Sequence, residues 1–301
     1  MRLIGIMIAL LSLSPALAQS EQFLVVTGIA QDAGYPQAAC HKDCCKRVEN
    51  GKTKAQMVSS LALVDYRDSS YHIFEMTPDF RAQSRYVESK YQVKGPKSIF
   101  LSHAHIGHYS GLMFLGKESR STNEVPCYVM PRMEDFLRTN GPWSQLIEIG
   151  NIELRSVENN TAEVGKVTVE AVQVPHRDEF SETIGFFIQS ANKKVLFIPD
   201  IDKWDRWEMD LKTWISKADL LLLDGTFYSD GELKGRDMSQ IPHPFVTETM
   251  DYLQDLSDAE KSKVHFIHLN HSNPLLWDKK SQESLNKRSF NLAFEGQVIE
   301  L

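Results

Sequence analysis

The sequence predicts a mixed α/β protein in which sheets and helices pack in layers. Short runs rich in Val, Ile and Phe, which are typical of β-strands, recur along the chain between Gly, Pro, Asn and Asp turn signals. Stretches with helical patterns alternate with these runs, and neither a low-complexity linker nor a shift in composition divides the chain. We therefore expect a single domain over residues 19–301.

The first half of the chain is dominated by expected strands. Their apolar residues partly alternate with polar ones, as in strands with one buried face. The runs cover residues 22–30, 59–66, 71–76, 97–103, 126–130, 151–157 and 166–174. Two stretches have a helical pattern instead, residues 79–91 and the segment that follows His108.

The second half alternates between strand and helix patterns. The expected strands cover residues 183–190, 193–200, 218–227 and 263–271, and the expected helices lie around 203–216 and 244–256. Two short runs at the end, 290–296 and 297–301, predict a closing β-hairpin. This alternation is typical of sheets that are covered by helices.

The overall composition indicates a globular protein that acts on a small molecule. Of the 301 residues 42% are hydrophobic and 24% charged, and the formal net charge is −7. A nucleic-acid-binding surface normally has a basic excess or a basic stripe, and the sequence has no long Lys/Arg run. We therefore expect a small-molecule substrate and no nucleic-acid partner.

The first 18 residues have the pattern of a secretory signal peptide. Arg2 precedes an apolar run that ends at Leu13, and the small-residue pattern "ALA" comes directly before Gln19. No later segment reaches the roughly 20 apolar residues that a membrane-spanning helix needs. We expect cleavage before Gln19 and a periplasmic or secreted protein; a buried N-terminal helix or an uncleaved anchor is the alternative.

Three of the four cysteines, Cys40, Cys44 and Cys45, cluster in "CHKDCC". A disulfide between the adjacent Cys44 and Cys45 would be strained, and clustered thiolates favour a structural zinc site, but three ligands leave that site one short. A Cys40–Cys44 or Cys40–Cys45 disulfide is an alternative, as is His41 as the fourth ligand. We interpret Cys127, at a strand start, as a buried small apolar residue.

Three histidines, His103, His105 and His108, lie within the stretch "LSHAHIGHYSGL". His103 and His105 are two residues apart at the end of an expected strand, so both side chains point to the same side of an extended chain. His108 follows where the chain turns toward a helix, so the three imidazoles can converge on one point. This spacing predicts a metal site.

Further side chains that can bind metal end other expected strands. They are His176 in "AVQVPHRDEF", Asp200 in "KKVLFIPDID", and His268 and His271 in "KVHFIHLNH". Each polar group breaks an apolar strand, which costs stability unless the group finds a partner. We expect these residues to meet the three histidines at one shared edge of the fold.

The order of these residues resembles the metallo-β-lactamase superfamily, whose signature is H-x-H-x-D-H followed by single His, Asp and His ligands on later strands. The resemblance implies an αββα sandwich, with two mixed sheets flanked by helices. It also implies a first metal held by His103, His105 and His176, a bridging Asp200, and a second metal held by His108 and His268. Imidazole and carboxylate ligands suit zinc, with iron or manganese as substitutes.

One position departs from this signature. Gly107 stands where the superfamily motif has aspartate, so the stretch reads H-A-H-I-G-H and the second metal loses a carboxylate. We expect a water to fill the gap. The resemblance therefore predicts a tight first metal site and a weaker second one.

Other stretches resemble particular branches of the superfamily. "FEMTPDF" is similar to its first acidic motif, with Glu75 at the usual aspartate position, where a carboxylate orients a ligand histidine. The stretches "GIAQDAGYPQAAC", "TPDFRAQ" and "PHRDEFSETIGFFI" resemble the branch that contains the pyrroloquinoline quinone biosynthesis B proteins.

Two features resemble the phosphodiesterases of the superfamily. Residues 224–253 are similar to a strand end followed by a loop histidine, here His243, that donates a proton to a leaving oxygen; a surface loop histidine is the alternative. A cyclic phosphodiesterase branch also carries a structural zinc held by an N-terminal cysteine cluster and a histidine three residues after the last catalytic one. That histidine is His271 here, which implies four ligands with Cys40, Cys44 and Cys45.

The resemblance implies a hydrolase that uses a metal-activated hydroxide, because a metal with an open position lowers the pKa of bound water to about 7. Asp200 would hold the hydroxide, and the second metal or His243 would stabilise or protonate the leaving group. We favour a phosphodiester, an ester or a lactone as substrate. Two alternatives stay open: an iron-dependent, oxygen-using enzyme like the quinone-biosynthesis branch, and a metal-bound protein with little catalysis.

Overall fold

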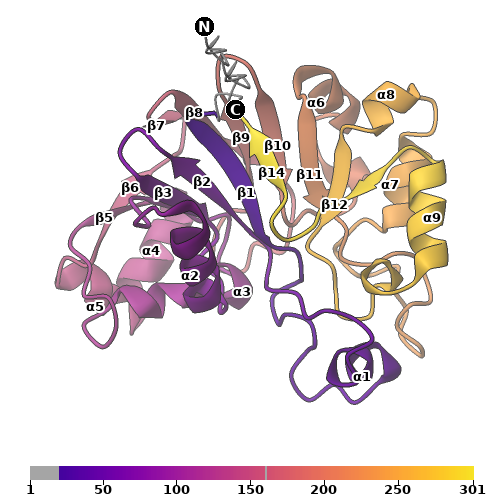
Figure 1. Cartoon of the computed structure of the whole chain (residues 1–301), viewed down its shortest axis with the longest axis horizontal. Helices are drawn as coiled ribbons and strands as arrows, with labels where there is room; N and C mark the ends of the chain where they lie inside the picture. Colours follow the sequence, from indigo (N-terminus) through magenta and orange to yellow (C-terminus); the bar gives the residue numbers. More distant parts are fainter. Residues whose placement is uncertain (1–19, 160) are drawn as a thin grey trace, which may run out of the picture.

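Two mixed β-sheets lie face to face between two layers of helices (Figure 1). The computed structural model describes residues 20–159 and 161–301, and the sheets and helices belong to these ranges. This arrangement confirms the αββα sandwich that the sequence predicts. The predicted signal peptide, residues 1–18, lies outside the described residues.

The first sheet is antiparallel on one side and parallel on the other. Neighbouring strands run antiparallel from β14 to β3 and parallel from β3 to β6. In spatial order the strands are β14 (Val298–Glu300), β1 (Gln22–Gly28), β2 (Ser60–Asp65), β3 (Ser70–Phe74), β4 (Ile99–Phe100), β5 (Val125–Val129) and β6 (Ile152–Ser156).

The second sheet has the same mixed character. Its neighbouring strands run parallel from β13 to β10 and antiparallel from β10 to β7. In spatial order the strands are β13 (Asn291–Leu292), β12 (Val264–Ile267), β11 (Leu220–Asp224), β10 (Lys194–Ile198), β9 (Ile184–Gln189), β8 (Val167–Gln173) and β7 (Thr161–Val164).

Each sheet is covered on its outer face by its own helices (Figure 1). The first is covered by α2 (Phe80–Tyr91), α3 (Ile106–Tyr109), α4 (Pro131–Thr139) and α5 (Trp143–Glu148). The second is covered by α6 (Leu211–Lys217), α7 (Val246–Tyr252), α8 (Asp258–Lys261) and α9 (Lys279–Lys287). Helix α1 (Asp43–Glu49) lies apart from both layers. The 3₁₀ turns are η1 (Ser110–Leu115), η2 (Trp204–Arg206) and η3 (Pro274–Leu276). Among the described residues, no helix is long and apolar enough to cross a membrane.

Two large cores form on the faces of the strands: one lies between the sheets and continues beneath the helices of the second sheet, and the other lies beneath the helices of the first sheet. In the paired strands β1 and β2, Leu24 lies opposite Leu63 and both join the core between the sheets. The next pair, Val25 and Ala62, joins the core beneath the helices of the first sheet. Because both faces are covered, β1 is buried along its whole length.

The C-terminal strands do not form the closing hairpin that the sequence predicts. β13 pairs with β12 in the second sheet, whereas β14 pairs with β1 in the first. Between them the chain crosses from one sheet to the other, and the Gly296 N–H donates to the Val26 carbonyl over 2.8 Å. The edge of β1 is thereby paired rather than left open, which no local turn signal reveals.

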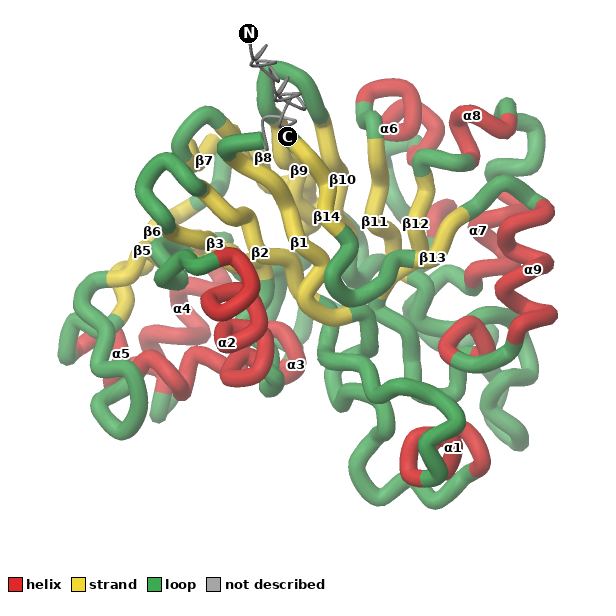
Figure 2. The backbone as a smooth tube through the Cα atoms, viewed as in Figure 1, coloured by secondary structure: helices red, strands yellow, loops and turns green. Residues whose placement is uncertain are grey.

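The carboxyl ends of several strands meet at one edge of the sandwich. Strands β3 and β4 are parallel, as are β10, β11 and β12, and β8 points the same way as β10 because each runs antiparallel to β9. Figure 2 shows loops gathered below the two sheets, where α1 also lies. Side chains that follow these strands are therefore brought together.

Candidate metal centre

The first candidate metal group contains His103, His105, His176 and Asp200, whose ligand atoms all lie within 4.8 Å of one another. His103 Nε2 lies 2.8 Å from His105 Nδ1 and 3.3 Å from Asp200 Oδ2. A tetrahedral ion bound at 2.0–2.1 Å holds its ligand atoms roughly 3.3 Å apart. The four side chains therefore have the spacing of a metal site.

Unpartnered polar atoms point to the same conclusion. Both ring nitrogens of His176 and Oδ1 of Asp200 are buried and make no hydrogen bond within the described part of the chain. Burying such atoms without a partner costs a few kcal/mol, on the order of 1–3 for each group. A metal ion between the side chains would be that partner, so the residues present fit one.

The second candidate group contains His108, His268, Asp32 and again Asp200. Asp32 Oδ1 lies 3.2 Å from Nε2 of both His108 and His268. Asp200 Oδ2 lies 3.0 Å from His108 Nε2, and the same oxygen is the one that faces His103 in the first group. Asp200 thus joins the two groups, in the bridging position that the resemblance implies.

The sequence reasoning missed Asp32. It expected a gap on the second metal, filled by water, because residue 107 is glycine. The carboxylate of Asp32 lies in this second group instead, so the expectation of a group one carboxylate short is wrong. Asp32 follows the first predicted strand, just as the other candidate ligands follow their own strands, so the sequence did contain a sign of its role. The histidines that Asp32 contacts, however, lie far away in the sequence.

The first group is electrostatically prepared for a cation. Burial, reinforced by nearby His108, holds the pKa of His103 well below its ordinary value, and burial lowers the pKa of His176 to about 4. Burial alone would raise the pKa of Asp200, but His268, His103 and other histidines outweigh it and hold that pKa well below its ordinary value. Neutral imidazoles and an ionised carboxylate are the protonation states that metal ligands need.

The second group also favours a positive charge at its centre. Burial opposes charge on His108, but the carboxylates of Glu75, Asp200 and Asp32 outweigh burial and raise its pKa well above the ordinary value. His108 and His268 likewise overcome burial and hold the pKa of Asp32 well below its usual range. A divalent cation bound between these side chains would supply this positive charge.

Glu75 lies behind His108, where the sequence places an orienting carboxylate. Its Oε2 accepts from His108 Nδ1 over 3.1 Å, and its Oε1 accepts from the Ser102 N–H over 3.1 Å. Glu75 and His268 both have a positive φ, 73° and 63°, which is strained for residues other than glycine. Strain of this kind is typical of functional sites.

His243 is buried beside the two groups, which excludes the surface-loop alternative. Its Nδ1 donates to Asp224 Oδ2 over 2.8 Å, and Asp224 Oδ1 accepts from the hydroxyl and the N–H of Thr226 over 2.7 and 2.9 Å. His243 Nδ1 is also 3.5 Å from Asp200 Oδ1. Asp224, which was not named as a candidate site residue from the sequence, is the last residue of β11 and orients His243.

The cysteine cluster brings Cys40, Cys44, Cys45 and His271 within 4.8 Å of one another. The Sγ atoms of Cys40 and Cys44 are 3.9 Å apart, and His271 Nδ1 lies 3.6 Å from Cys44 Sγ and 3.3 Å from Cys45 Sγ. A zinc ion bound by sulfur at about 2.3 Å holds two sulfurs roughly 3.8 Å apart. The four side chains therefore fit a tetrahedral zinc site.

The alternatives for these cysteines do not match the structure. All four cysteines are free, so neither the Cys40–Cys44 nor the Cys40–Cys45 disulfide is present. His41 is exposed and lies outside the group. Cys127 is buried beneath the helices of the first sheet, as expected of a small apolar residue.

The comparison with known families agrees with this geometry. Residues 73–268 match the model of the beta-lactamase superfamily domain, a span that contains every member of the two catalytic groups except Asp32. The chain belongs to the β-lactamase superfamily. Its two sheets and helical layers are the metallo-β-lactamase fold.

Similar proteins within this superfamily cover almost the whole chain. Coenzyme PQQ synthesis protein B of Methylococcus capsulatus is 25% identical over 310 residues, which is 92% of this chain and 99% of the relative. The zinc-bound PqqB of Methylobacterium extorquens superposes with a TM-score of 0.77 at 22% identity, covering 93% and 100% of the two chains. A diphosphatase of the PhnP family superposes with a TM-score of 0.66 at 19% identity, covering 93% and 97%. The resemblance to the quinone-biosynthesis B branch is thus confirmed.

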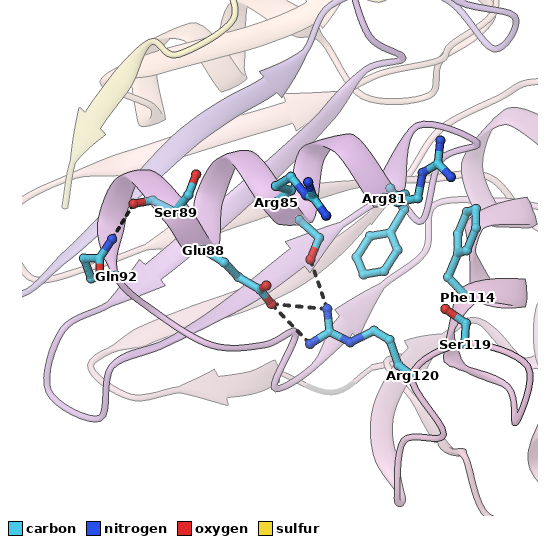
Figure 3. Close-up of a pocket in the computed structure, with 10 residues that line it drawn as sticks. Arg81, Arg85, Glu88, Ser89, Gln92, Phe114, Ser119 and Arg120 are labelled. Atoms are coloured by element: carbon cyan, nitrogen blue, oxygen red, sulfur yellow. Dashed lines mark hydrogen bonds and ion pairs between the residues drawn. The ribbon is translucent and has the colours of Figure 1, made fainter.

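A pocket of about 490 Å³ lies away from the metal groups, between α2 and the segment around Arg120 (Figure 3). Phe80 and Phe114 are among the residues that line it, and Arg81 and Arg85 extend from α2 beside it. Arg120 donates to Glu88 over 3.1 Å. None of its lining residues belongs to a metal group.

The loop that carries His243 contains a titratable group, Glu232. Its carboxylate accepts from the Ser272 hydroxyl and, over 2.7 Å, from the Tyr228 N–H, and burial raises its pKa to about 7. The folded protein therefore keeps a proton that the unfolded chain loses above pH 4.5. It follows that the stability contributed by protonated Glu232 falls as pH rises from about 4.5 to about 7.

Replacing Glu232 by glutamine should remove this pH dependence. We expect the free energy of unfolding of wild type, relative to Glu232→Gln, to fall by on the order of 3 kcal/mol between pH 4.5 and 7.5. Urea unfolding at several pH values measures this difference, with the exposed Glu208→Gln as the matched control. A difference that does not change with pH would contradict the assignment.

Proposed function

We propose that the protein is a zinc-dependent hydrolase with two catalytic metals, acting on a phosphodiester or on an ester or lactone. The observation that carries the proposal is the position of Asp200, whose Oδ2 faces His103 at 3.3 Å and His108 at 3.0 Å and so joins two ligand groups. A metal bound by each of the two joined groups would supply the charge that stabilises both the attacking and the leaving oxygen of a displacement.

The protein's own residues supply the remaining parts of the reaction. When bound, zinc lowers the pKa of a water to about 7 and makes hydroxide available at neutral pH. Asp200 Oδ1 is buried and lies 3.2 Å from His268 Nδ1 without forming a hydrogen bond, so it could accept from that hydroxide and orient it. Burial opposes charge on His243, but the Asp224 carboxylate beside Nδ1 outweighs it and raises the pKa of the ring, so protonated His243 can donate from Nε2 to the leaving oxygen.

Two exposed apolar side chains stand beside the first metal group. Ile106 directly follows His105 and is 67% exposed, and Phe180 is 60% exposed. Phe180 directly follows Glu179, whose Oε2 lies 3.3 Å from His105 Nε2. Large exposed apolar groups next to a site favour a substrate with an apolar or aromatic part.

We also propose that the protein works in the periplasm or outside the cell. The pattern of residues 1–18 supports this location. The cysteine cluster is compatible with it, because zinc-bound thiolates need no disulfide partner there. In this proposal the cluster zinc is structural and takes no part in the reaction.

The test compares hydrolysis by the zinc-loaded protein and its His243→Gln variant on aryl and alkyl phosphodiesters, esters, lactones and a β-lactam. We expect zinc-dependent turnover of one of the first three classes. His243→Gln should slow substrates with alkyl leaving groups by roughly 10²–10⁴-fold and p-nitrophenyl substrates much less, because p-nitrophenolate leaves without a proton.

His265→Gln, which changes a histidine of β12 outside the metal groups, is the matched control and should behave as wild type. No turnover of any class by the zinc-loaded protein would contradict the hydrolase proposal. An equal loss on both leaving groups would contradict the role of His243 as proton donor.

The similarity to coenzyme PQQ synthesis protein B favours a second candidate, a redox role in cofactor synthesis with a single iron. The carboxylate of Asp32 in the second group supports two metals rather than a single one. Elemental analysis of the purified protein decides between the two. Iron in one catalytic group with the other group empty would support this candidate and contradict the hydrolase.

A further inference from the structure

We propose that Asp32 is a ligand of the second catalytic metal, and that Gly107 is glycine because the Asp32 carboxylate enters from the N-terminal loop in place of a side chain at position 107. This inference rests on the proposed function only in assuming that two metals bind. It assigns the missing carboxylate of the motif to a residue 75 positions earlier in the chain.

The first step is the geometry of the Asp32 carboxylate. Its Oδ1 lies 3.2 Å from Nε2 of His108 and 3.2 Å from Nε2 of His268, between the two imidazoles that the motif assigns to the second metal. These separations match the roughly 3.3 Å expected between ligand atoms on one tetrahedral ion. Its side chain is 29% exposed, so an incoming ion can reach it.

Three carboxylates face the two ring nitrogens of His108. Its Nδ1 faces the Glu75 carboxylate at 3.1 Å, and its Nε2 faces Asp32 at 3.2 Å and Asp200 at 3.0 Å. A neutral imidazole carries one N–H and cannot donate from both nitrogens, so without a metal only a protonated ring would satisfy both sides. A metal bound at Nε2 needs no such second proton, because Nδ1–H of the neutral ring then donates to Glu75 while the carboxylates of Asp32 and Asp200 bind the same ion.

The second step is the space at Gly107. A Cβ atom on Gly107 would lie 2.5 Å from both Cα and Cβ of Asp32 and 2.6 Å from its Cγ. Gly107 lies in helix α3 and has no positive φ, so the backbone conformation does not require glycine there. The close approach of Asp32 requires it. An aspartate at 107 and the present position of Asp32 therefore exclude each other.

The third step is how the chain holds Asp32 in place. Ala30 forms parallel bridges to Val58 and to Leu269, and the Gln31 N–H donates to the Leu269 carbonyl over 2.9 Å. Asn270 Nδ2 donates to Gln31 Oε1 over 2.6 Å. The backbone before Asp32 is thus paired with the residues that directly follow His268, which fixes both ligands relative to each other.

The experiment measures zinc rather than activity. Zinc equivalents per chain and the dissociation constant of the weaker catalytic zinc, by competition with a chromogenic chelator, are compared for wild type, Asp32→Ala, Gly107→Asp and the double variant Asp32→Gly/Gly107→Asp. We expect Asp32→Ala to weaken one catalytic zinc by more than about 100-fold, beyond what loss of an orienting partner causes. The other zinc ions should stay bound.

Gly107→Asp alone should weaken the same zinc, because it displaces Asp32. The double variant should bind that zinc at least tenfold more tightly than either single variant, since it returns one carboxylate to the same place. Asp32→Asn, which keeps the side-chain shape, repeats the test if Asp32→Ala does not fold. Asp43→Ala removes another carboxylate of the N-terminal segment and should leave zinc binding unchanged.

Zinc binding within threefold of wild type in both Asp32→Ala and Asp32→Asn would overturn the inference. A double variant that stays as weak as Asp32→Ala would overturn the role given to Gly107. A wild-type protein that binds both catalytic zinc ions, the second of them through Asp32, and yet hydrolyses no substrate supports this inference while contradicting the proposed function, so the two failures are distinguishable.

Discussion

Replacing Asp200 by alanine should empty both catalytic metal groups at once. One oxygen of Asp200 faces His103 at 3.3 Å and His108 at 3.0 Å, so its loss removes a ligand from each group. We expect the protein to lose two zinc equivalents, to keep the zinc of the cysteine cluster, and to lose hydrolysis by a factor of at least about 10³. Elemental analysis and single-substrate kinetics measure both effects.

The control for this variant lies two residues further along the chain. Asp202 also follows β10, but it accepts from Arg206 over 2.7 Å and belongs to none of the metal groups. Asp202→Ala should therefore keep all zinc and most of its activity. If Asp200→Ala loses only one zinc equivalent, Asp200 binds a single metal and the bridging role is wrong.

Replacing Cys45 by serine should remove the third zinc and loosen the loop that carries Asp32. The chain runs from Asp32 into the cysteine cluster, and His271, which completes the cluster, follows His268 by three residues. We expect the loss of one zinc equivalent and a fall in Tm of roughly 10 °C. We also expect weaker binding of the second catalytic zinc, because Asp32 is then held less firmly.

Two control variants separate this effect from a general loss of stability. Cys127→Ala removes the cysteine outside the cluster and His41→Ala removes the histidine inside the "CHKDCC" stretch; both should keep the full zinc content. His271→Ala should behave like Cys45→Ser. A Cys45→Ser protein with unchanged zinc content and Tm would show that the cluster does not hold a structural metal.

Most of the fold could be predicted because apolar runs directly reflect burial. Strand β11, for example, reads "LLLLD" and is apolar up to its last residue because it lies between two other parallel strands in a sheet covered on both faces. The prediction of a closing hairpin was wrong because this pairing depends on distant parts of the chain rather than on local apolar runs. The partner of β14 is β1, at the other end of the chain, and local sequence contains no sign of such a pairing.

The site residues likewise divide into those that local sequence predicts and one that depends on distant parts of the chain. His103, His105 and His108 lie in one short stretch, so their convergence follows from strand geometry and a turn. Asp32 could not be found in this way, because its nearness to His108 depends on backbone pairing between residues 29–31 and the segment after His268. Gly107 is apparent in the sequence, but the superfamily motif indicates only that a ligand is missing there. The sequence does not show that the absence of a side chain at 107 leaves room for the Asp32 carboxylate.

The most direct test of the account is the position of metal in a crystal of the zinc-loaded protein, located by anomalous scattering at the zinc edge. We predict three peaks: one among His103, His105, His176 and Asp200, one among Asp32, His108, Asp200 and His268, and one in the cysteine cluster. A single peak at the catalytic edge, or a second peak from which the Asp32 carboxylate is turned away, would contradict it.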